Sequence, residues 1–248
     1  RFFGGPNGEA LGGTHSEIPT ILLRIYGSVS NPNQRRELGL VANTPPFGVP
    51  NANACPKLTS KRLVREYMLI NDAKVEGSVE VLWLQCKTWF VDIRTGFNED
   101  PGKGWAFAGQ IEWEEPRVTF YHLIDTDGDT GSDCGSFVFT NLGCLEVGEV
   151  IRDNVLLPFE EKWLRFADSS STRAFIAEND NQLAAVKIQQ ANYTACVSKL
   201  GAAIYVDQGG VLELDRIFTT REKDTDGSST VALLDYFASA RWQLAEIS

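Results

Sequence analysis

The chain has 248 residues, with 23 Lys and Arg against 33 Asp and Glu, so its formal net charge is −10. Hydrophobic residues make up 43% and charged residues 23%, which is typical of a globular protein and excludes a disordered one. The acidic balance argues against a nucleic-acid or anionic-membrane partner, because both need clustered Lys and Arg. No apolar run approaches the ~20 residues of a membrane span. We therefore expect a soluble protein of the cytoplasm or of an organelle lumen.

The first 60 residues are rich in Gly, Pro and Asn, and they contain one strand-like run, Ile18–Val29. Three prolines between Asn43 and Asn51 predict a loop there. The chain starts with Arg1 and not with Met, so we expect that a leader, a tag or another preceding segment has been removed. Residues 1–60 are predicted to form an N-terminal arm.

Eight short strand-like runs fill the next hundred residues. They are Arg62–Leu69, Val79–Gln85, Trp89–Arg94, Trp105–Trp113, Arg117–Asp125, Ser136–Thr140, Leu145–Ile151 and Leu157–Phe166. Short connections without amphipathic helices favour an antiparallel sandwich or barrel and disfavour a parallel β/α fold. Residues 61–168 are therefore predicted to form one mainly β domain.

Further strand-like runs predict a second β-rich domain over residues 169–248. The runs are Ala174–Glu178, Ala184–Tyr193, Ala195–Leu200, Ala202–Asp207 and Leu212–Thr220. A helical spacing of three or four residues indicates one C-terminal helix over Val231–Ala245; the residues are Leu234, Phe237 or Ala238, Trp242 and Ala245. Two further strands fit this tail almost as well.

Cysteine and aspartate spacing limits the metal chemistry. The five cysteines form no C-x-x-C pair, which argues against structural zinc and, in so long a chain, favours reduced thiols over a disulfide framework. Four aspartates between Asp125 and Asp133 are spaced like calcium ligands, but Thr130 replaces the glycine of a calcium loop and Ser136 its bidentate glutamate. We predict an acidic turn and no metal site, with a looser calcium site as the alternative. The sequence indicates no particular cofactor.

Alternation along the strands assigns side chains to the two faces of the sheet. Pairing across a three-residue turn, residues 86–88, puts Trp83 and Gln85 on the same aromatic face as Trp89. The opposite face then carries Phe90, Asp92 and Arg94, with Glu80 opposite Arg94 in a cross-strand ion contact.

The next two runs place Phe107, Trp113 and His122 on one apolar face, while the alternation points Asp125 away from it. Gln85 and His122 are thus polar groups among apolar side chains, and each needs a hydrogen-bond partner. A core neighbour could supply it, or a ligand in a barrel cavity could. The predicted ligand-binding residues are Trp83, Gln85, Trp89, Phe107, Trp113 and His122.

Six short motifs follow one another between residues 62 and 166. They are Trp83-Leu84-Gln85, Phe90-Val91-Asp92-Ile93-Arg94, Ala106-Phe107-Ala108-Gly109, His122-Leu123-Ile124-Asp125, Leu145-Glu146-Val147-Gly148 and Glu161-Lys162-Trp163. In order and spacing they resemble the fungal Hri-one family and its uncharacterised bacterial relatives. The resemblance implies two adjacent lipocalin-like (calycin-like) β-barrels, of which we expect the second to be smaller or incomplete. It implies no established reaction.

Three functions fit these observations. The first is a carrier or sensor of a small apolar or aromatic ligand, favoured by the aromatic face with Gln85 and His122. The second is a barrel enzyme of isomerase, cyclase or lyase type, with His122 as the acid/base and Asp125 or Glu161 as its carboxylate partner. The third is a non-catalytic subunit of a larger protein assembly, suggested by the irregular arm. No G-x-S-x-G, Walker A or G-x-G-x-x-G motif points elsewhere.

Overall fold

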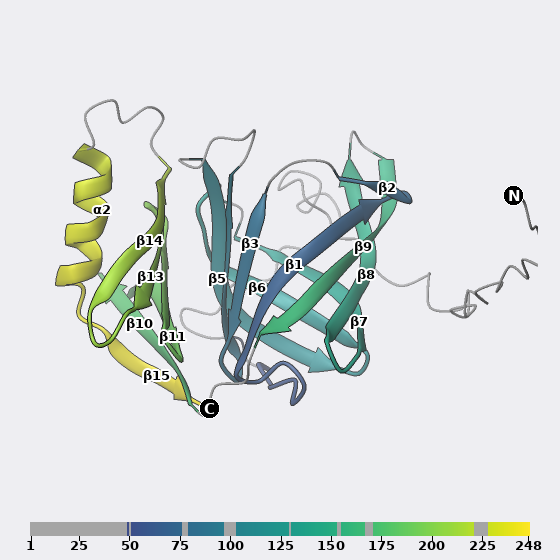
Figure 1. Ribbon diagram of the computed structural model, residues 1–248, viewed down its shortest axis with the longest axis horizontal. Coiled ribbons are helices and arrows are strands. Elements are labelled where there is room, and N and C mark those ends of the chain that lie inside the picture. The colour runs from purple at the N-terminus through teal and green to yellow at the C-terminus, as the bar shows by residue number, and fades with distance from the viewer. Residues whose placement is uncertain are drawn as a thin grey trace, which may run out of the picture.

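The computed structural model describes residues 49, 51–75, 79–96, 103–128, 130–152, 155–166, 171–220 and 228–248. The predicted run Ile18–Val29 and most of the predicted arm lie outside these residues. The described residues form three layers, which are a β-barrel, an open sheet beside it and a helix on the far side of that sheet (Figure 1).

Within the described residues, eight strands close into an antiparallel barrel, which confirms the predicted architecture. They are β1 (Lys61–Ile70), β3 (Glu80–Gln85), β4 (Trp89–Thr95), β5 (Gly104–Glu114), β6 (Arg117–Asp125), β7 (Ser132–Phe139), β8 (Gly143–Arg152) and β9 (Val155–Phe166). Strands adjacent in this order pair with each other, and β1 pairs with β9 to close the wall. The short strand β2 (Ala73–Lys74) pairs only with the end of β1. Each of the eight predicted runs overlaps one barrel strand.

The second sheet has six strands in the described part of the chain. They are β10 (Thr172–Asn179), β11 (Gln182–Gln190), β12 (Tyr193–Ser198), β13 (Gly201–Asp207), β14 (Leu212–Thr219) and β15 (Gln243–Ile247), in the order β14-β13-β12-β11-β10-β15. Helix α2 (Ser228–Ser239) packs on one face of the sheet through Leu233 and Phe237. An open sheet with one helix thus stands where an incomplete second barrel was predicted.

The predicted helix over Val231–Ala245 is too long. The chain leaves α2 after Ser239 and adds β15 to the edge of the sheet, next to β10. Trp242 folds back onto the end of the helix, where its Nε1 donates to the carbonyl oxygen of Phe237 at 3.1 Å. The four-residue spacing of Trp242 from Ala238 therefore does not mark a further helical turn.

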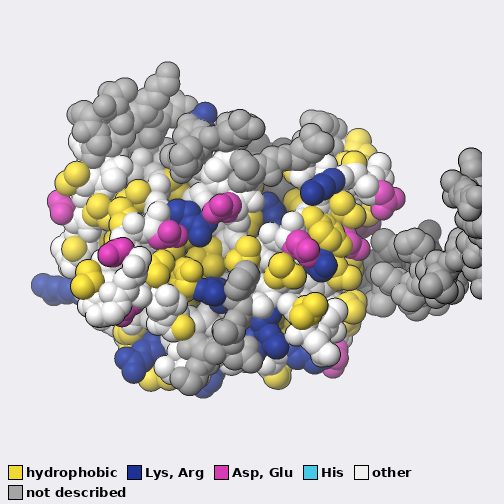
Figure 2. Space-filling model, in the orientation of Figure 1, with side chains coloured by type: hydrophobic (Ala, Val, Ile, Leu, Met, Phe, Trp, Pro, Cys, Tyr) yellow, Lys and Arg dark blue, Asp and Glu magenta, His cyan; other side chains and the backbone are white. Residues whose placement is uncertain are grey.

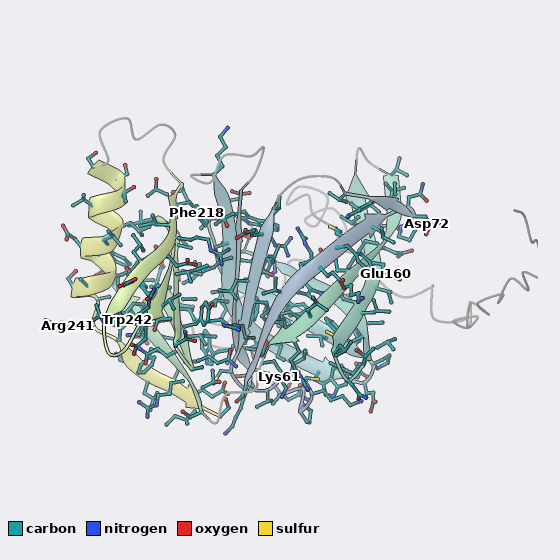
Figure 3. All side chains as sticks on the ribbon, in the orientation of Figure 1. Lys61, Asp72, Glu160, Phe218, Arg241 and Trp242 are labelled. Carbon is teal, nitrogen blue, oxygen red and sulfur yellow. The ribbon has the colours of Figure 1, made fainter. Side chains whose placement is uncertain are left out.

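The second sheet covers one side of the barrel wall and creates an apolar core between the two sheets. The outer faces of β3–β6 contact β11–β13, with buried residues such as Leu84 and Val91 from the barrel and Val186 and Ile204 from the sheet. Phe218, labelled in Figure 3, belongs to the same core. Strands β3 and β4 are consequently buried on both faces, one toward the barrel interior and one toward the second sheet.

The pairing of β3 with β4 differs by one residue from the predicted pairing. Cys86 N donates to Trp89 O at 2.8 Å, and Gln85 lies opposite Phe90, so the turn contains only two residues. Trp89 therefore faces the second sheet, and the prediction that it lies inside the barrel is wrong. Asp92 moves to the inner face instead.

The predicted contact between Glu80 and Arg94 is also absent from the described structure. Glu80 accepts a hydrogen bond from Arg216 Nη1 of β14 at 2.7 Å, whereas Arg94 points into the barrel. The error has the same cause as the wrong turn. Strands with two apolar faces show no alternation from which their register can be read.

The described end of the predicted arm closes one end of the barrel. Cys55 and Leu58 are buried in the barrel core. Asn53 pairs with the backbone of Trp113, because its Nδ2 donates to the Trp113 carbonyl oxygen and its Oδ1 accepts from the Trp113 amide. Residues 51–60 thus pack against the barrel through the buried side chains of Cys55 and Leu58.

The surface and the cysteines add little chemistry. On the face shown in Figure 2, Lys and Arg side chains are interspersed with Asp, Glu and apolar side chains. All five cysteines lie in the described ranges, and their thiols are free. Among the helices that the structure describes, none has the length and apolar character needed to cross a bilayer.

A carboxylate on the last strand holds the β3–β4 turn. Glu246 Oε2 accepts hydrogen bonds from the backbone amides of Lys87, Thr88 and Trp89 at 2.8, 2.8 and 3.3 Å. Its Oε1 accepts from Thr88 Oγ1 at 2.9 Å. These four bonds tie β15, and with it the second sheet, to the barrel.

Replacing Glu246 with Ala should therefore lower the free energy of unfolding by about 1–3 kcal/mol, because the turn amides lose a charged acceptor. Urea unfolding followed by circular dichroism measures the change. Glu213→Ala, at an exposed position of β14, is the matched control and should stay within about 0.5 kcal/mol of the parent. A Glu246→Ala variant as stable as the control would contradict this role.

Candidate functional site

The barrel interior holds a cavity of about 280 Å³ that is partly open to solvent. Seven rings form what we call the aromatic wall: Trp83, Phe90, Trp105, Phe107, Phe120, Phe159 and Trp163. Several of them meet edge to face, with ring centroids 5.3 Å apart for Trp83 and Phe120 and 5.2 Å apart for Trp83 and Trp163. Such contacts fix the ring orientations, so the cavity has a preformed shape.

Six charged or titratable side chains also line the cavity, of which the sequence predicted His122 and suggested Glu161 as its partner. They are Asp92, Arg94, His122, Asp133, Glu146 and Glu161. Asp92, His122, Glu146 and Glu161 each expose less than a tenth of their surface. Buried charges are costly unless they are paired, so the partners of these groups decide what the cavity can do.

A β-bulge places the histidine beside a carboxylate. Gly109 pairs with His122 and Ala108 with Ile124, so the register skips Leu123. A side chain at Gly109 would collide with the backbone of Tyr121, and only glycine fits there. The bulge turns Asp125 to the side of the sheet on which His122 lies, whereas plain alternation points it away.

His122 lies between two carboxylates. Its Nδ1 is 3.5 Å from Asp125 Oδ2, and its Nε2 is 3.5 Å from Asp133 Oδ2. The ring stacks on Phe107, with centroids 4.1 Å apart. Burial by itself lowers the pKa of His122, but the negative charges of Asp133 and Asp125 outweigh it and raise the pKa to about 9. The imidazole is therefore a cation at neutral pH.

The second carboxylate oxygen of Asp125 also accepts hydrogen bonds from the protein. Its Oδ1 accepts from Trp105 Nε1 at 3.1 Å and from the Asp127 amide at 2.7 Å. Its Oδ2 and the Nε2 of His122 have no hydrogen-bond partner among the described residues. At 3.5 Å the contacts of His122 are ion pairs rather than short hydrogen bonds.

Arg94 and Asp92 form a second pair on β4. Arg94 Nε donates to Asp92 Oδ1 at 2.8 Å. The guanidinium also lies over two rings of the aromatic wall, 4.6 Å from the centroid of Trp105 and 5.0 Å from that of Phe107. Burial alone would lower the pKa of Arg94, but the neighbouring carboxylates, Asp92 foremost, raise it above its ordinary value.

Two glutamates face each other across β8 and β9. Glu146 lies opposite Glu161 in the register. Glu161 Oε1 pairs with Arg65 Nη1 at 2.7 Å, and Glu146 Oε2 accepts from Trp163 Nε1 at 2.9 Å. Burial, followed by the charges of Glu161 and Asp133, raises the pKa of Glu146 well above its ordinary value. Glu146 therefore keeps its proton to a higher pH than an ordinary glutamate does.

Three of the six predicted ligand-binding residues line this cavity, namely Trp83, Phe107 and His122. Gln85 is buried in the barrel, but its amide is satisfied by protein, because Oε1 accepts from Trp83 Nε1 at 3.0 Å and Nε2 donates to the carbonyl oxygens of Lys87 and Trp89. Trp113 packs on Phe139 away from the cavity. That any of the six binds a ligand stays a prediction.

Metal binding finds no support in the described ranges, where no cluster of three or more His, Cys, Asp and Glu side chains is arranged to hold an ion. Two aspartates of the predicted acidic turn contact a histidine instead of a metal ion. Asp125 and Asp133 turn toward His122, and Asp129 lies outside the described residues.

Comparison with known proteins identifies the fold alone. No protein-family model and no curated protein matches the chain. The crystal structure of the uncharacterized protein YLR301w from Saccharomyces cerevisiae is similar, with a TM-score of 0.54 and 14% sequence identity. The similarity covers 76% of this chain and 98% of the yeast chain. It supports the β-barrel with its second sheet and carries no information about a ligand or a reaction.

The pKa of His122 gives a direct test of the site geometry. Asp125→Asn should lower this pKa from about 9 toward the ordinary value of 6.5, because the mutation removes one of the two carboxylates. NMR titration of the imidazole resonances measures it, and His15→Gln assigns the signals of the two histidines. An unchanged pKa in Asp125→Asn would contradict the pairing.

The same pairing predicts a pH dependence of stability. Because the folded-state pKa of His122 lies above the ordinary value, the stabilisation by the charged ring is fully present below pH 6.5 and is lost as the pH rises toward about 9. The free energy of unfolding of the parent should therefore fall over this range more than that of His122→Gln. Urea unfolding of both proteins between pH 6 and about 9.5 measures the difference.

Proposed function

We propose that this protein binds a small molecule with an apolar or aromatic body inside the barrel, as a carrier or sensor. The observation that carries the proposal is the cavity of about 280 Å³ with its aromatic wall and its buried charged groups. Packed interiors leave few voids larger than a water molecule, so a space of this size in a barrel core is exceptional and supports a ligand site. Its volume is close to the lower end of the range for ligand pockets.

The lining supports a ligand that is mainly apolar but has a polar end. Seven rings offer flat apolar contact, whereas the charged side chains can orient one polar group. His122 is a specific candidate for this contact, since its buried Nε2 lacks a hydrogen-bond partner among the described residues. A ligand or a water molecule must satisfy that nitrogen.

An enzyme of isomerase, cyclase or lyase type is the second candidate, and the contact of His122 with Asp125 favours it. With a pKa of about 9, His122 would act as a proton donor at neutral pH and not as a base. In this case His122→Gln would bind a substrate but not turn it over. Membership of the Hri-one family, a lipocalin-like origin and a role as an assembly subunit stay predictions.

Filling the cavity tests the binding proposal. Val150 lines the cavity from β8, and Val147 lies on the outer face of the same strand, so Val150→Phe and Val147→Phe add the same ring on opposite sides of the wall. We expect 2-naphthalenemethanol, a neutral aromatic probe, to bind the parent and Val147→Phe. Val150→Phe should bind it at least about tenfold more weakly, because the added ring occupies the cavity. Isothermal titration calorimetry measures the affinities, and equal affinities of the two variants would overturn the proposal.

A further inference from the structure

The groups around the cavity carry an excess of negative charge. Five carboxyl groups of the described residues line it or pair with its lining, against three basic groups. The carboxyl groups are Asp92, Asp125, Asp133, Glu146 and Glu161, and the basic groups are Arg65, Arg94 and His122. With every group ionised, the site holds two negative charges more than positive ones. An anionic ligand would add to this imbalance, whereas a cationic ligand would reduce it.

The basic groups are already engaged by carboxylates. Arg94 pairs with Asp92 at 2.8 Å and Arg65 with Glu161 at 2.7 Å, while His122 lies between Asp125 and Asp133. Glu146 differs from the other cavity carboxylates, because it forms no ion pair with a described residue. A cation that enters the cavity could therefore form an ion pair with the carboxylate of Glu146.

The aromatic wall suits a cation as well. Ring faces attract ammonium and guanidinium groups through their quadrupole, most strongly where water is excluded. Arg94 already uses this attraction over Trp105 and Phe107. Beside Glu146, Trp163 donates its indole N–H to the carboxyl group and packs against Trp83, so a second aromatic surface adjoins the unpaired carboxyl.

The glycine at position 135 leaves room for the side chain of Glu146. A Cβ at Gly135, on the neighbouring strand β7, would lie 2.5 Å from both Cγ and Oε1 of Glu146. Any side chain at Gly135 would therefore displace the carboxyl. The position thus lets Glu146 lie flat against β7 and reach the cavity.

We propose that the ligand of this cavity is a small organic cation, an ammonium or amidinium group on an apolar or aromatic body, and that Glu146 is its counter-ion. This inference rests on the proposed binding function and adds the chemical class of the ligand. The cationic group would lie against Glu146 and the rings of Trp163 and Trp83, and a polar atom of the ligand or a water molecule would accept from His122 Nε2.

Cation binding should be coupled to proton release. In the empty cavity Glu146 faces Glu161 and Trp163 of β9 and Asp133 of β7, with Arg94 of β4 also close enough to act on its charge. Burial and the two carboxylates raise its pKa and favour the protonated form. A bound ammonium group favours the carboxylate instead, so the Glu146 proton passes to the buffer as the ligand binds. The affinity for a cation should therefore rise with pH until Glu146 is ionised in the free protein.

Three probes of matched shape and different charge test the ligand class by calorimetry at pH 7: 2-naphthylmethylammonium, 2-naphthalenemethanol and 2-naphthoate. We expect the ammonium to bind at least about tenfold more tightly than the alcohol, and the carboxylate to bind most weakly. Glu146→Gln keeps the shape and the acceptor for Trp163 but removes the charge, so the ammonium should lose most of its advantage while the alcohol binds as before. Glu149→Gln, on the outer face of the same strand, is the matched control and should behave as the parent.

Proton release is measured on the unmodified protein, so it does not depend on the folding of a variant. Titrations of the ammonium in phosphate and in Tris, which differ in ionisation enthalpy, should show that protons are released as the ligand binds. Absence of release, or an ammonium preference that survives in Glu146→Gln, would overturn the role of Glu146. Equal or tighter binding of the alcohol or of naphthoate would overturn the cation class but leave the binding function standing. If none of the three probes binds, the binding function fails and the inference fails with it.

Discussion

The structure depends on one stretch of barrel wall that is buried on both sides. Strands β3–β6 contribute one face to the barrel interior and the other to the core shared with the second sheet. The two cores together bury most of the apolar side chains of these strands, and each contributes to the stability of the same backbone. The second sheet is therefore a structural support of the barrel and not an appendage, and Glu246 extends this support to the β3–β4 turn.

Charges can exist inside such a wall only because they are paired. Burial removes water from Arg94, His122 and Glu161, and neighbouring groups of opposite charge replace that solvation. Glu146 is treated differently, since a hydrogen bond from an indole and a raised pKa take the place of an ion pair. The result is a cavity in which ion pairs solvate Arg94, His122 and Glu161, whereas Glu146 relies on the indole hydrogen bond instead.

The sequence was sufficient to place the strands but not the faces of the site. The eight barrel runs could be found because turn residues separate short apolar segments. The inner position of Asp92 and Arg94 could not, because β3 and β4 are apolar on both faces and their register depends on whether the turn has two or three residues. If a two-residue turn at Lys87 and Thr88 had been assumed, Phe90, Asp92 and Arg94 would have been placed inside the barrel.

The other site residues could not be placed from the sequence for similar local reasons, although Asp125 and Glu161 were considered as carboxylate partners of His122. Asp125 turns inward through a bulge, whose only trace in the sequence is the glycine at position 109. Glu146 and Glu161 become neighbours through the pairing of β8 with β9, which a single sequence does not reveal. His122 was found from its apolar neighbours alone, and its pairing with Asp133 depends on the same long-range strand contacts.

The cover that the second sheet provides is one-sided, and this has a dynamic consequence. The far half of the barrel presents its outer surface to solvent, with Val138 and Leu156 among its exposed side chains. Opening a strand there sacrifices one apolar interface, whereas opening β3 or β4 sacrifices two. We therefore expect local opening to cost less in β7–β9, the strands that bear Asp133, Glu146 and Glu161, than in β3 and β4. The second sheet thus stabilises the β3–β6 side of the barrel, whereas three of the cavity carboxyl groups lie on the less supported strands β7–β9.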